Sequence, residues 1–202
     1  MSIEIEAKMA LDDPEPLRRR LLRVGARPMG CIRETNIFFD DADRTLKAAD
    51  HGLRLRINES MQDPAAATAR PGREVTLTHK GPRQPGPLKR RSETEIRIDD
   101  PDAATRLLAA LGYRPVLTFE KHRERYFLGR CEIALDHLPW LGHFIEIEGP
   151  GESAVMDVRR RLGLEDLPLI TASYIAMLAD CAAQHGLSVS HIHLDDPAPT
   201  AP

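Results

Sequence analysis

Charged and apolar residues alternate along most of the segments that the sequence predicts to be strands. Near the N-terminus, Glu4, Glu6 and Lys8 are separated by Ile5 and Ala7. Because successive side chains of a strand point to opposite faces, these three ionic side chains share one face. The same spacing groups Arg54 with Arg56, Thr78 with Lys80, Arg91 with Glu93 and Glu95, Lys121 with Arg123 and Arg125, and Glu146 with Glu148. One face of nearly every predicted strand is therefore ionic.

The order of predicted strands and helices favours an α+β fold. Turn residues bound strands at about residues 3–9, 31–40, 52–58, 74–80, 90–98, 117–128, 131–136 and 143–149. Apolar residues at helical spacing indicate helices over about residues 14–24, 101–111, 152–162 and 173–185. The first two helices begin at Asp13-Pro14 and Asp100-Pro101, where a capping residue precedes proline at the first helical position. Prolines and consecutive alanines predict a mobile surface loop over residues 59–72.

Length and composition fit one soluble domain. The chain has 202 residues, of which 42% are hydrophobic and 29% charged. We expect a single domain over residues 1–186 and a C-terminal tail, residues 187–202, that is partly disordered.

Three sequence features indicate where the protein works and which partners it lacks. No apolar run or cleavage site of a secretory signal follows the first methionine, which favours a cytoplasmic protein without a membrane partner. Cys31, Cys131 and Cys181 are far apart and odd in number, which fits reduced cytosolic thiols. The net charge of −3 argues against a general nucleic-acid binder.

The ionic face has two interpretations. In the simpler one the sheet is open, its apolar face packs on helices and its charged face lies in water. However, a solvated face can carry any polar residue, whereas these positions carry Glu, Asp, Lys and Arg almost without Ser, Gln or Asn. Acids and bases also nearly balance. The acids are Glu4, Glu6, Glu93, Glu95, Asp136, Glu146 and Glu148, and the bases are Lys8, Arg54, Arg56, Lys80, Arg91, Lys121, Arg123 and Arg125.

In the second interpretation about eight strands close into a barrel whose ionic face lines a water-filled lumen. The helices would then pack outside, against the apolar face. Buried charges on this scale are tolerated only when each has a partner, a metal or a charged ligand. Clustered carboxylates attract Mg²⁺ or Mn²⁺, and clustered Arg and Lys attract phosphate oxygens. A metal-bound polyphosphate would satisfy both groups.

An ordered series of motifs resembles a known family. The motifs are Glu4-x-Glu6-x-Lys8, Leu53-Arg54-Leu55-Arg56, Thr78-x-Lys80, Arg91-x-Glu93-x-Glu95, Lys121-x-Arg123 and Phe144-x-Glu146-x-Glu148. Over roughly residues 1–180 they resemble the CYTH superfamily, also called the triphosphate tunnel metalloenzymes. The section from Phe119 to Tyr126, continuing through Asp136 to Phe144, is most similar to the class IV adenylyl cyclase branch.

The resemblance implies a closed antiparallel tunnel of about eight strands that binds a triphosphate and Mg²⁺ or Mn²⁺. It assigns Glu4, Glu6 and Glu148 to a first metal, and Asp136, Glu146 and Glu148 to a second. It assigns the phosphate oxygens to Arg54, Arg56, Lys80, Lys121 and Arg123, with Arg91 as a further member. Lys8, beside Glu4 and Glu6, would orient phosphate or tune the catalytic site. Glu93 and Glu95 would either bind metal or hold the bases in place.

The implied activity is that of a class IV adenylyl cyclase, which converts ATP to cyclic AMP and pyrophosphate. The same residues would serve a triphosphatase acting on thiamine triphosphate, a nucleoside triphosphate or tripolyphosphate. A non-catalytic module that binds polyphosphate or nucleotide is the third alternative. The sequence does not determine the oligomeric state, and a homodimer is one alternative.

Some residues with suggestive chemistry are interpreted as structural. His191-x-His193, followed by Asp195-Asp196, lies in the polar tail and is interpreted as solvated or as an adventitious metal site. Tyr174 is interpreted as a packing residue of the last helix.

Overall fold

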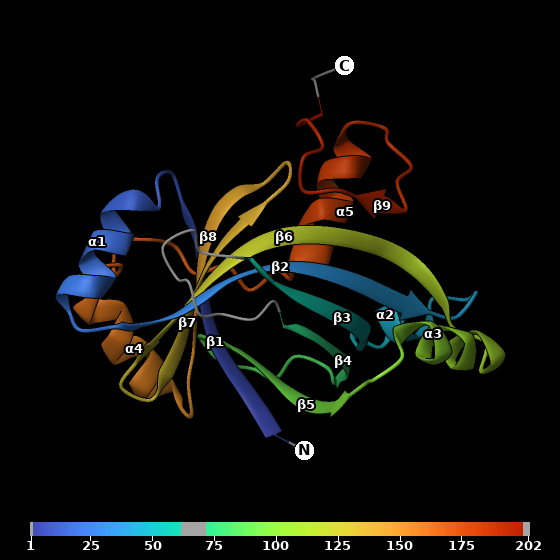
Figure 1. The fold of residues 1–202 in the computed structure, drawn as a ribbon, viewed down its shortest axis with the longest axis horizontal. Coiled ribbons are helices and arrows are strands. Elements are labelled where there is room, and N and C mark those ends of the chain that lie inside the picture. The colour runs from blue at the N-terminus through green and yellow to red at the C-terminus, as the bar shows by residue number, and fades with distance from the viewer. Residues whose placement is uncertain (1, 62–71, 200–202) are drawn as a thin grey trace.

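The strands that the structure describes belong to one sheet that closes on itself (Figure 1). The computed structural model describes residues 2–61 and 72–199. Its strands are β1 Ser2–Leu11, β2 Arg27–Asp40, β3 Gly52–Met61, β4 Arg73–Lys80, β5 Lys89–Arg97, β6 Arg114–Leu128, β7 Cys131–Leu138, β8 Gly142–Glu148 and β9 His191–Ile192. Its helices are α1 Glu15–Arg23, α2 Thr45–Ala48, α3 Pro101–Ala110, α4 Glu152–Arg161 and α5 Tyr174–Gln184.

Two long strands close the sheet. The strand order is β2-β3-β4-β5-β1-β8-β7-β6, and β2 also pairs with β6, from Arg27 opposite Phe127 to Asp40 opposite Arg114. These pairings are antiparallel throughout. The chain therefore forms a closed antiparallel barrel of eight strands, which confirms the predicted fold class. The open-sheet interpretation is wrong.

The register keeps ionic residues of neighbouring strands on one face. Glu4 of β1 lies opposite Arg91 of β5, and Glu6 of β1 lies opposite Glu148 of β8. Directly opposed residues project to the same side of a sheet, which here is the inner side of the barrel.

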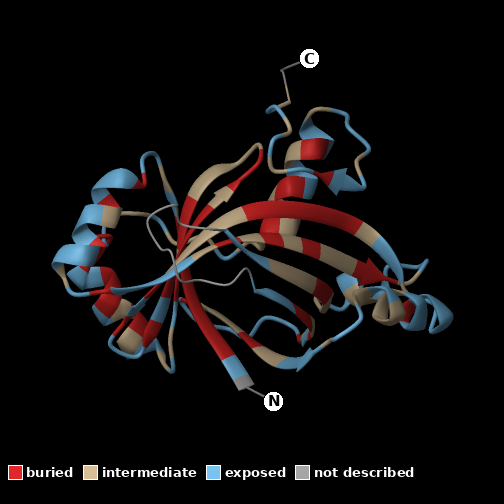
Figure 2. Ribbon diagram, in the orientation of Figure 1, coloured by how far each residue is buried: buried red, intermediate tan, exposed pale blue. Residues whose placement is uncertain are grey.

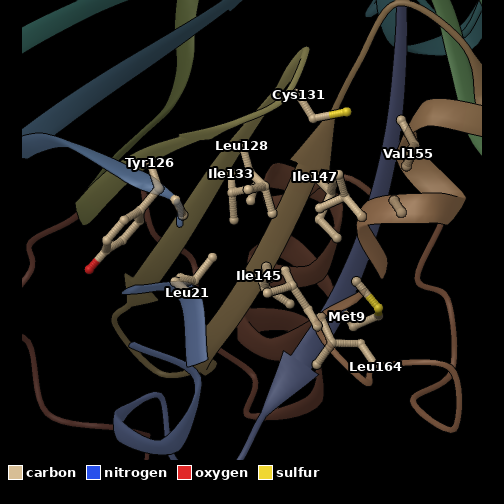
Figure 3. Packing of buried hydrophobic residues seen from close by; sticks show 14 of the residues in the cluster. Met9, Leu21, Tyr126, Leu128, Cys131, Ile133, Ile145, Ile147, Val155 and Leu164 are labelled. Atoms are coloured by element: carbon tan, nitrogen blue, oxygen red, sulfur yellow. The ribbon is translucent and has the colours of Figure 1, made fainter. Parts of the chain in front are cut away.

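The outer face carries the main apolar core. Met9, Ile145 and Ile147 are fully buried on β1 and β8, where they pack with Leu21 of α1 and Val155 of α4 (Figure 3). Figure 2 shows buried residues concentrated along the strands and exposed residues on the outer surfaces of α1 and α3. The helices thus cover the apolar side that the alternation predicts to face outward.

Helix α3 covers a second part of the outer face. Its Leu108 packs with Leu55 of β3 and Val75 of β4. The Asp100 carboxylate accepts hydrogen bonds from the backbone N–H groups of Asp102 and Ala103, at 3.0 and 2.9 Å. The predicted capped start at Asp100-Pro101 is therefore confirmed, whereas at Asp13-Pro14 the N-cap is Pro14, which has no side chain that can cap α1.

Helix α5 lies against inward-facing residues instead. Phe119 and Phe144 are two positions before Lys121 and Glu146 on their strands, so they project to the same inner face. Both pack with Leu178 of α5 in a separate buried cluster. The lumen is therefore apolar at this end, and α5 covers it.

The described part of the C-terminal tail is attached to the barrel. Strand β9 pairs in parallel with β6, with His191 opposite Thr118, and Ile192 is fully buried. The domain boundary at residue 186 stays a prediction, and residues 200–202 lie outside the described residues. Of the predicted loop over residues 59–72, the first residues to Met61 belong to β3, while residues 62–71 also lie outside. Among the described helices, none has the length and apolar character needed to cross a membrane.

Candidate functional site

The barrel encloses a cavity of about 980 Å³ with a largely charged lining. All but one of the predicted site residues line it, and they come from six strands. They are Glu4, Glu6, Lys8, Arg54, Arg56, Lys80, Arg91, Lys121, Arg123, Glu146 and Glu148. Asp136 lies behind this lining and is almost fully buried. Acidic and basic side chains from distant parts of the sequence therefore share one space.

Carboxylates gather where β1 pairs with β8. Glu6 lies directly opposite Glu148, and Lys8 lies opposite Glu146. Partial burial, together with the nearby Glu4 and Glu6 carboxylates, raises the pKa of Glu148 to about 7. Burial and the Glu146 and Glu4 carboxylates also raise the pKa of Glu6. A cation placed among these groups would relieve their mutual repulsion.

The donor set suits a hard divalent cation. Glu4, Glu6 and Glu148 offer only carboxylate oxygens, which Mg²⁺ and Mn²⁺ prefer. The Oε2 atom of Glu4 is buried and accepts no hydrogen bond from the described residues. Leaving such an atom unpaired is costly, and a bound cation would satisfy it. The residues present therefore fit the metal that the sequence predicts.

Several cationic groups of the lining have donors that make no hydrogen bond to a described residue, although Nζ of Lys8 lies 3.8 Å from Oε1 of Glu146. The Nζ of Lys8 and the Nε atoms of Arg54, Arg91 and Arg125 are buried without a hydrogen-bond partner in the described part of the chain. Burial and the neighbouring Arg56 guanidinium lower the pKa of Arg54 to about 10. Burial also lowers the pKa of Lys8. An anion with several oxygens would supply acceptors and offset the repulsion between cations.

Other cations are held by carboxylates. The Nζ of Lys80 lies 2.6 Å from Oε1 of Glu4 and 3.2 Å from Oε2 of Glu93. Oε2 of Glu95 accepts a hydrogen bond of 2.7 Å from the Thr78 hydroxyl. These contacts favour a holding role for Glu93 and Glu95 over metal ligation.

Asp136 is the centre of a buried network. Its carboxylate accepts hydrogen bonds from Nζ of Lys121 at 2.9 Å and from Nε and Nη2 of Arg123 at 2.7 Å each. The Tyr174 hydroxyl donates a further hydrogen bond of 3.0 Å. With these donors on its two oxygens, Asp136 has little capacity left for a metal. Its assignment to a second metal stays a prediction, and the geometry favours a role in orienting Lys121 and Arg123.

Two residues of β2 belong to this network although the sequence analysis missed them. The Glu34 carboxylate lies 3.2 Å from both Nζ of Lys121 and Nη2 of Arg56. Burial raises the pKa of Glu34, but Arg123, Arg56 and Lys121 together hold it well below its usual range. Asn36 accepts a hydrogen bond of 2.9 Å from Nε of Arg56. Glu34 and Asn36 are two positions apart in a predicted strand, so the same alternation could have identified them.

Lys89 and Asp50 were also missed. Nζ of Lys89 lies 2.9 Å from Oε1 of Glu6, and Nη2 of Arg91 lies 2.6 Å from Oδ1 of Asp50. Lys89 is two positions before Arg91, so the alternation also predicts its face. Asp50 lies in the connection before β3 with a φ of 56°, where strand alternation gives no information.

Tyr174 links α5 to the site. Its side chain is buried, as a packing residue should be, but its hydroxyl donates to Asp136 and its ring centroid lies 4.1 Å from Nζ of Lys8. The cation therefore sits over an aromatic face at the apolar end of the lumen. The interpretation of Tyr174 as packing alone omitted this polar contact.

Comparison with known proteins gives one family and several relatives. Residues 2–174 match the model of the CYTH domain family. The chain is 30% identical over 181 residues to the adenylate cyclase CyaB of Aeromonas hydrophila, covering 85% of this chain and 86% of the relative. It is 27% identical over 146 residues to MJ0240 of Methanocaldococcus jannaschii, which is named as a candidate adenylate cyclase. This match covers 72% of this chain and 76% of the relative.

Solved structures share the fold. The PH1819 protein of Pyrococcus horikoshii superposes with a TM-score of 0.73 at 28% identity, over 88% of this chain and 98% of that protein. A candidate adenylyl cyclase from Hippeastrum, described as having a dominant triphosphatase activity, has a TM-score of 0.65 at 18% identity, over 94% and 98%. The latter likeness concerns the fold alone.

We predict that divalent-metal affinity depends on pH near neutrality. Glu148 must lose its proton to bind a cation, and its pKa is raised to about 7. Mn²⁺ affinity, measured by isothermal titration calorimetry from pH 5.5 to 8.5, should level off above the pKa and fall by up to about tenfold per pH unit below it. In Glu148→Gln the affinity should be lower and this step near neutrality should disappear. A wild-type affinity that is constant across this range would contradict the assignment.

We predict that Tyr174→Phe weakens both stability and anion binding. The change removes the hydroxyl that donates to the buried Asp136 carboxylate, which should lower the free energy of unfolding by about 1.5–3 kcal/mol. Because Asp136 orients Lys121 and Arg123, affinity for inorganic tripolyphosphate should also fall. The matched control is Tyr126→Phe, which loses a 3.1 Å hydrogen bond to Glu124 elsewhere in the fold. If both variants bind tripolyphosphate like the wild type, Tyr174 has no role in the site.

Proposed function

Because the chain belongs to the CYTH domain family, we propose that it is a divalent-metal-dependent enzyme that cleaves a triphosphate inside its barrel. The proposed reaction is the conversion of ATP to cyclic AMP and pyrophosphate. The observation that carries the proposal is that clustered carboxylates share one cavity with buried cationic donors that lack hydrogen-bond partners among the described residues. The adenylate cyclase names of the two curated relatives support the reaction type.

The cationic side chains would bind the triphosphate. Lys8 and Arg54 have buried donors that can reach an anionic oxygen without first breaking a protein hydrogen bond. Lys121 and Arg123 are held by Asp136, so they would meet the phosphates already oriented. In phosphoryl transfer the protein contributes mainly positioning and neutralisation of oxygen charge, and both follow from this arrangement.

Glu4, Glu6 and Glu148 would hold Mg²⁺ or Mn²⁺, with Glu146 close by. A bound divalent cation supplies charge neutralisation at the phosphate oxygens. Lys80 would keep Glu4 in place through the 2.6 Å ion pair between them.

The cavity also has an apolar part that suits an organic group on the triphosphate. Phe38 of β2, Ile175 and Ala179 of α5 and Val189 after α5 line it beside the charged residues. Pockets that bind organic ligands combine apolar walls with a few polar groups, as this one does. This favours a nucleotide over inorganic tripolyphosphate as substrate.

In the cyclase reaction the ribose 3′-hydroxyl oxygen forms a bond to the α-phosphorus while the bond from that phosphorus to the departing pyrophosphate breaks. Hydrolysis is the second candidate, in which water attacks the terminal phosphorus instead. The same lining would serve it, because either reaction needs the triphosphate to be positioned and the charge on its oxygens to be neutralised. The third candidate is a protein that binds the triphosphate without converting it to a product.

Product analysis of the purified protein tests these alternatives. With ATP and Mn²⁺ or Mg²⁺, we expect cyclic AMP and pyrophosphate in equal amounts, and little turnover of tripolyphosphate or thiamine triphosphate. Glu4→Gln should lower kcat/KM by at least about 100-fold because it removes a predicted metal ligand. The matched control is Glu124→Gln, whose carboxylate pairs with Arg18 of α1.

Free phosphate without cyclic AMP would replace the cyclase with a triphosphatase. Metal-dependent ATP binding without any product would leave only a binding module. Absence of both binding and turnover would overturn the proposed function.

A further inference from the structure

A second group of ligand-type side chains lies apart from the cavity lining, where the tail meets β6. His191 and His193 of the tail come together with Glu120 of β6, and one potential ligand atom from each lies within 4.8 Å of the others. The two imidazole rings stack with centroids 4.0 Å apart. Glu120 is adjacent to Lys121 on its strand and therefore projects away from the lumen. This cluster is distinct from the carboxylates that face the cavity.

The tail is held in this position by backbone and apolar contacts. The Thr118 N–H donates to the Ser190 carbonyl at 2.8 Å, and Ile192 is completely buried in the cluster with α5. The two histidines flank Ile192, so alternation places both on the face opposite to it. The sequence interpretation of these histidines, as solvated or as an adventitious metal site in a polar tail, did not include this strand.

The Glu120 carboxylate is built into the site. It is buried, and its Oε2 accepts hydrogen bonds from Nη2 of Arg33 at 2.7 Å and from the Leu194 N–H at 3.0 Å. The Arg33 guanidinium and the Leu194 N–H compensate the charge of the buried carboxylate. Both hydrogen bonds go to Oε2, and Oε1 accepts no hydrogen bond from the described residues. Second partners of this kind fix the orientation of a metal-binding carboxylate.

The histidines are accessible and can supply nitrogen ligands. Both imidazole side chains are exposed, and each ring nitrogen can bind a metal when the imidazole is neutral. Nδ1 of His193 lies 3.7 Å from Oε2 of Glu120. The backbone N–H of His193 donates a hydrogen bond of 2.7 Å to Oδ2 of Asp196. Small side-chain rotations would bring the three ligand atoms to the roughly 3.4 Å separation that tetrahedral coordination with bonds of about 2.1 Å requires.

We propose that Glu120, His191 and His193 form a zinc-type transition-metal site that fastens the C-terminal tail to β6. Two imidazole nitrogens and one carboxylate oxygen are a ligand set for Zn²⁺, with water in the fourth position, whereas the oxygen-only set in the lumen suits Mg²⁺ or Mn²⁺. The site joins β9, a strand of two residues, to the long strand β6. A bound metal would therefore stabilise the short pairing between these two strands. It does not depend on the reaction in the lumen.

Zinc titration of the full-length protein tests the site. Calorimetry with Zn²⁺ alone as titrant, in a phosphate-free buffer containing millimolar Mg²⁺ to occupy the lumen carboxylates, should detect one site that is lost in His191→Gln/His193→Gln. We expect its affinity to fall by at least about 100-fold, since removal of even an outer-shell partner costs 10–100-fold. Hydrogen exchange of residues 188–196 should slow on addition of Zn²⁺ in the wild type and not in this variant.

The matched control is His137→Gln/His143→Gln. These rings also lie together, with centroids 4.6 Å apart, but within the described residues no carboxylate joins them in a metal-type group. The control should bind Zn²⁺ like the wild type. Since His191 and His193 are exposed, their replacement should leave the melting temperature without Zn²⁺ unchanged. Equal Zn²⁺ affinity in the wild type and His191→Gln/His193→Gln, or equal loss in the control, would overturn the proposal.

Discussion

Charge compensation inside a closed barrel is the constraint on which this structure depends. Pairing of β2 with β6 removes the ionic face from bulk water, so each charge needs a nearby opposite charge or a ligand. Asp136 and Glu34 meet this requirement for Lys121 and Arg123. Loss of one partner from such a buried set costs about 3–5 kcal/mol, because the other charge is left uncompensated.

In one part of the lumen the protein's own side chains compensate one another's charges only in part. Lys121 and Arg123 are hydrogen-bonded to carboxylates, whereas Lys8 and Arg54 keep buried donors without a hydrogen-bond partner among the described residues. Burial, together with neighbouring carboxylates, likewise raises the pKa values of Glu148 and Glu6. Anionic oxygens and a divalent cation would complete both groups at once. The affinity proposed for a metal-bound triphosphate would therefore come from the charges that the protein leaves uncompensated.

Much of this could be predicted from the sequence because a strand has a period of two. That period identified the inward residues from Glu4 to Glu148, and the excess of charge over neutral polar residues indicated that the face is enclosed. It could not establish closure, which depends on pairing between strands far apart in the chain. It also overlooked Glu34, since one acid beside an asparagine does not look like an ionic strand.

The other omissions concern contacts that no local pattern encodes. Tyr174 fits the apolar stripe of α5, and its hydroxyl gains a role only because that helix covers the end of the lumen. His191 and His193 lie in a strand of two residues, which is too short to produce a recognisable alternation. Their proximity to Glu120 depends on the tertiary position of the tail.

The most direct test of the central claim is a crystal structure with Mn²⁺ and an ATP analogue that can be neither hydrolysed nor cyclised. The account predicts an anomalous Mn²⁺ peak among Glu4, Glu6 and Glu148, with triphosphate oxygens against Lys8, Arg54 and Lys121. An analogue and metal bound only outside the barrel, with the lumen side chains unchanged, would contradict it.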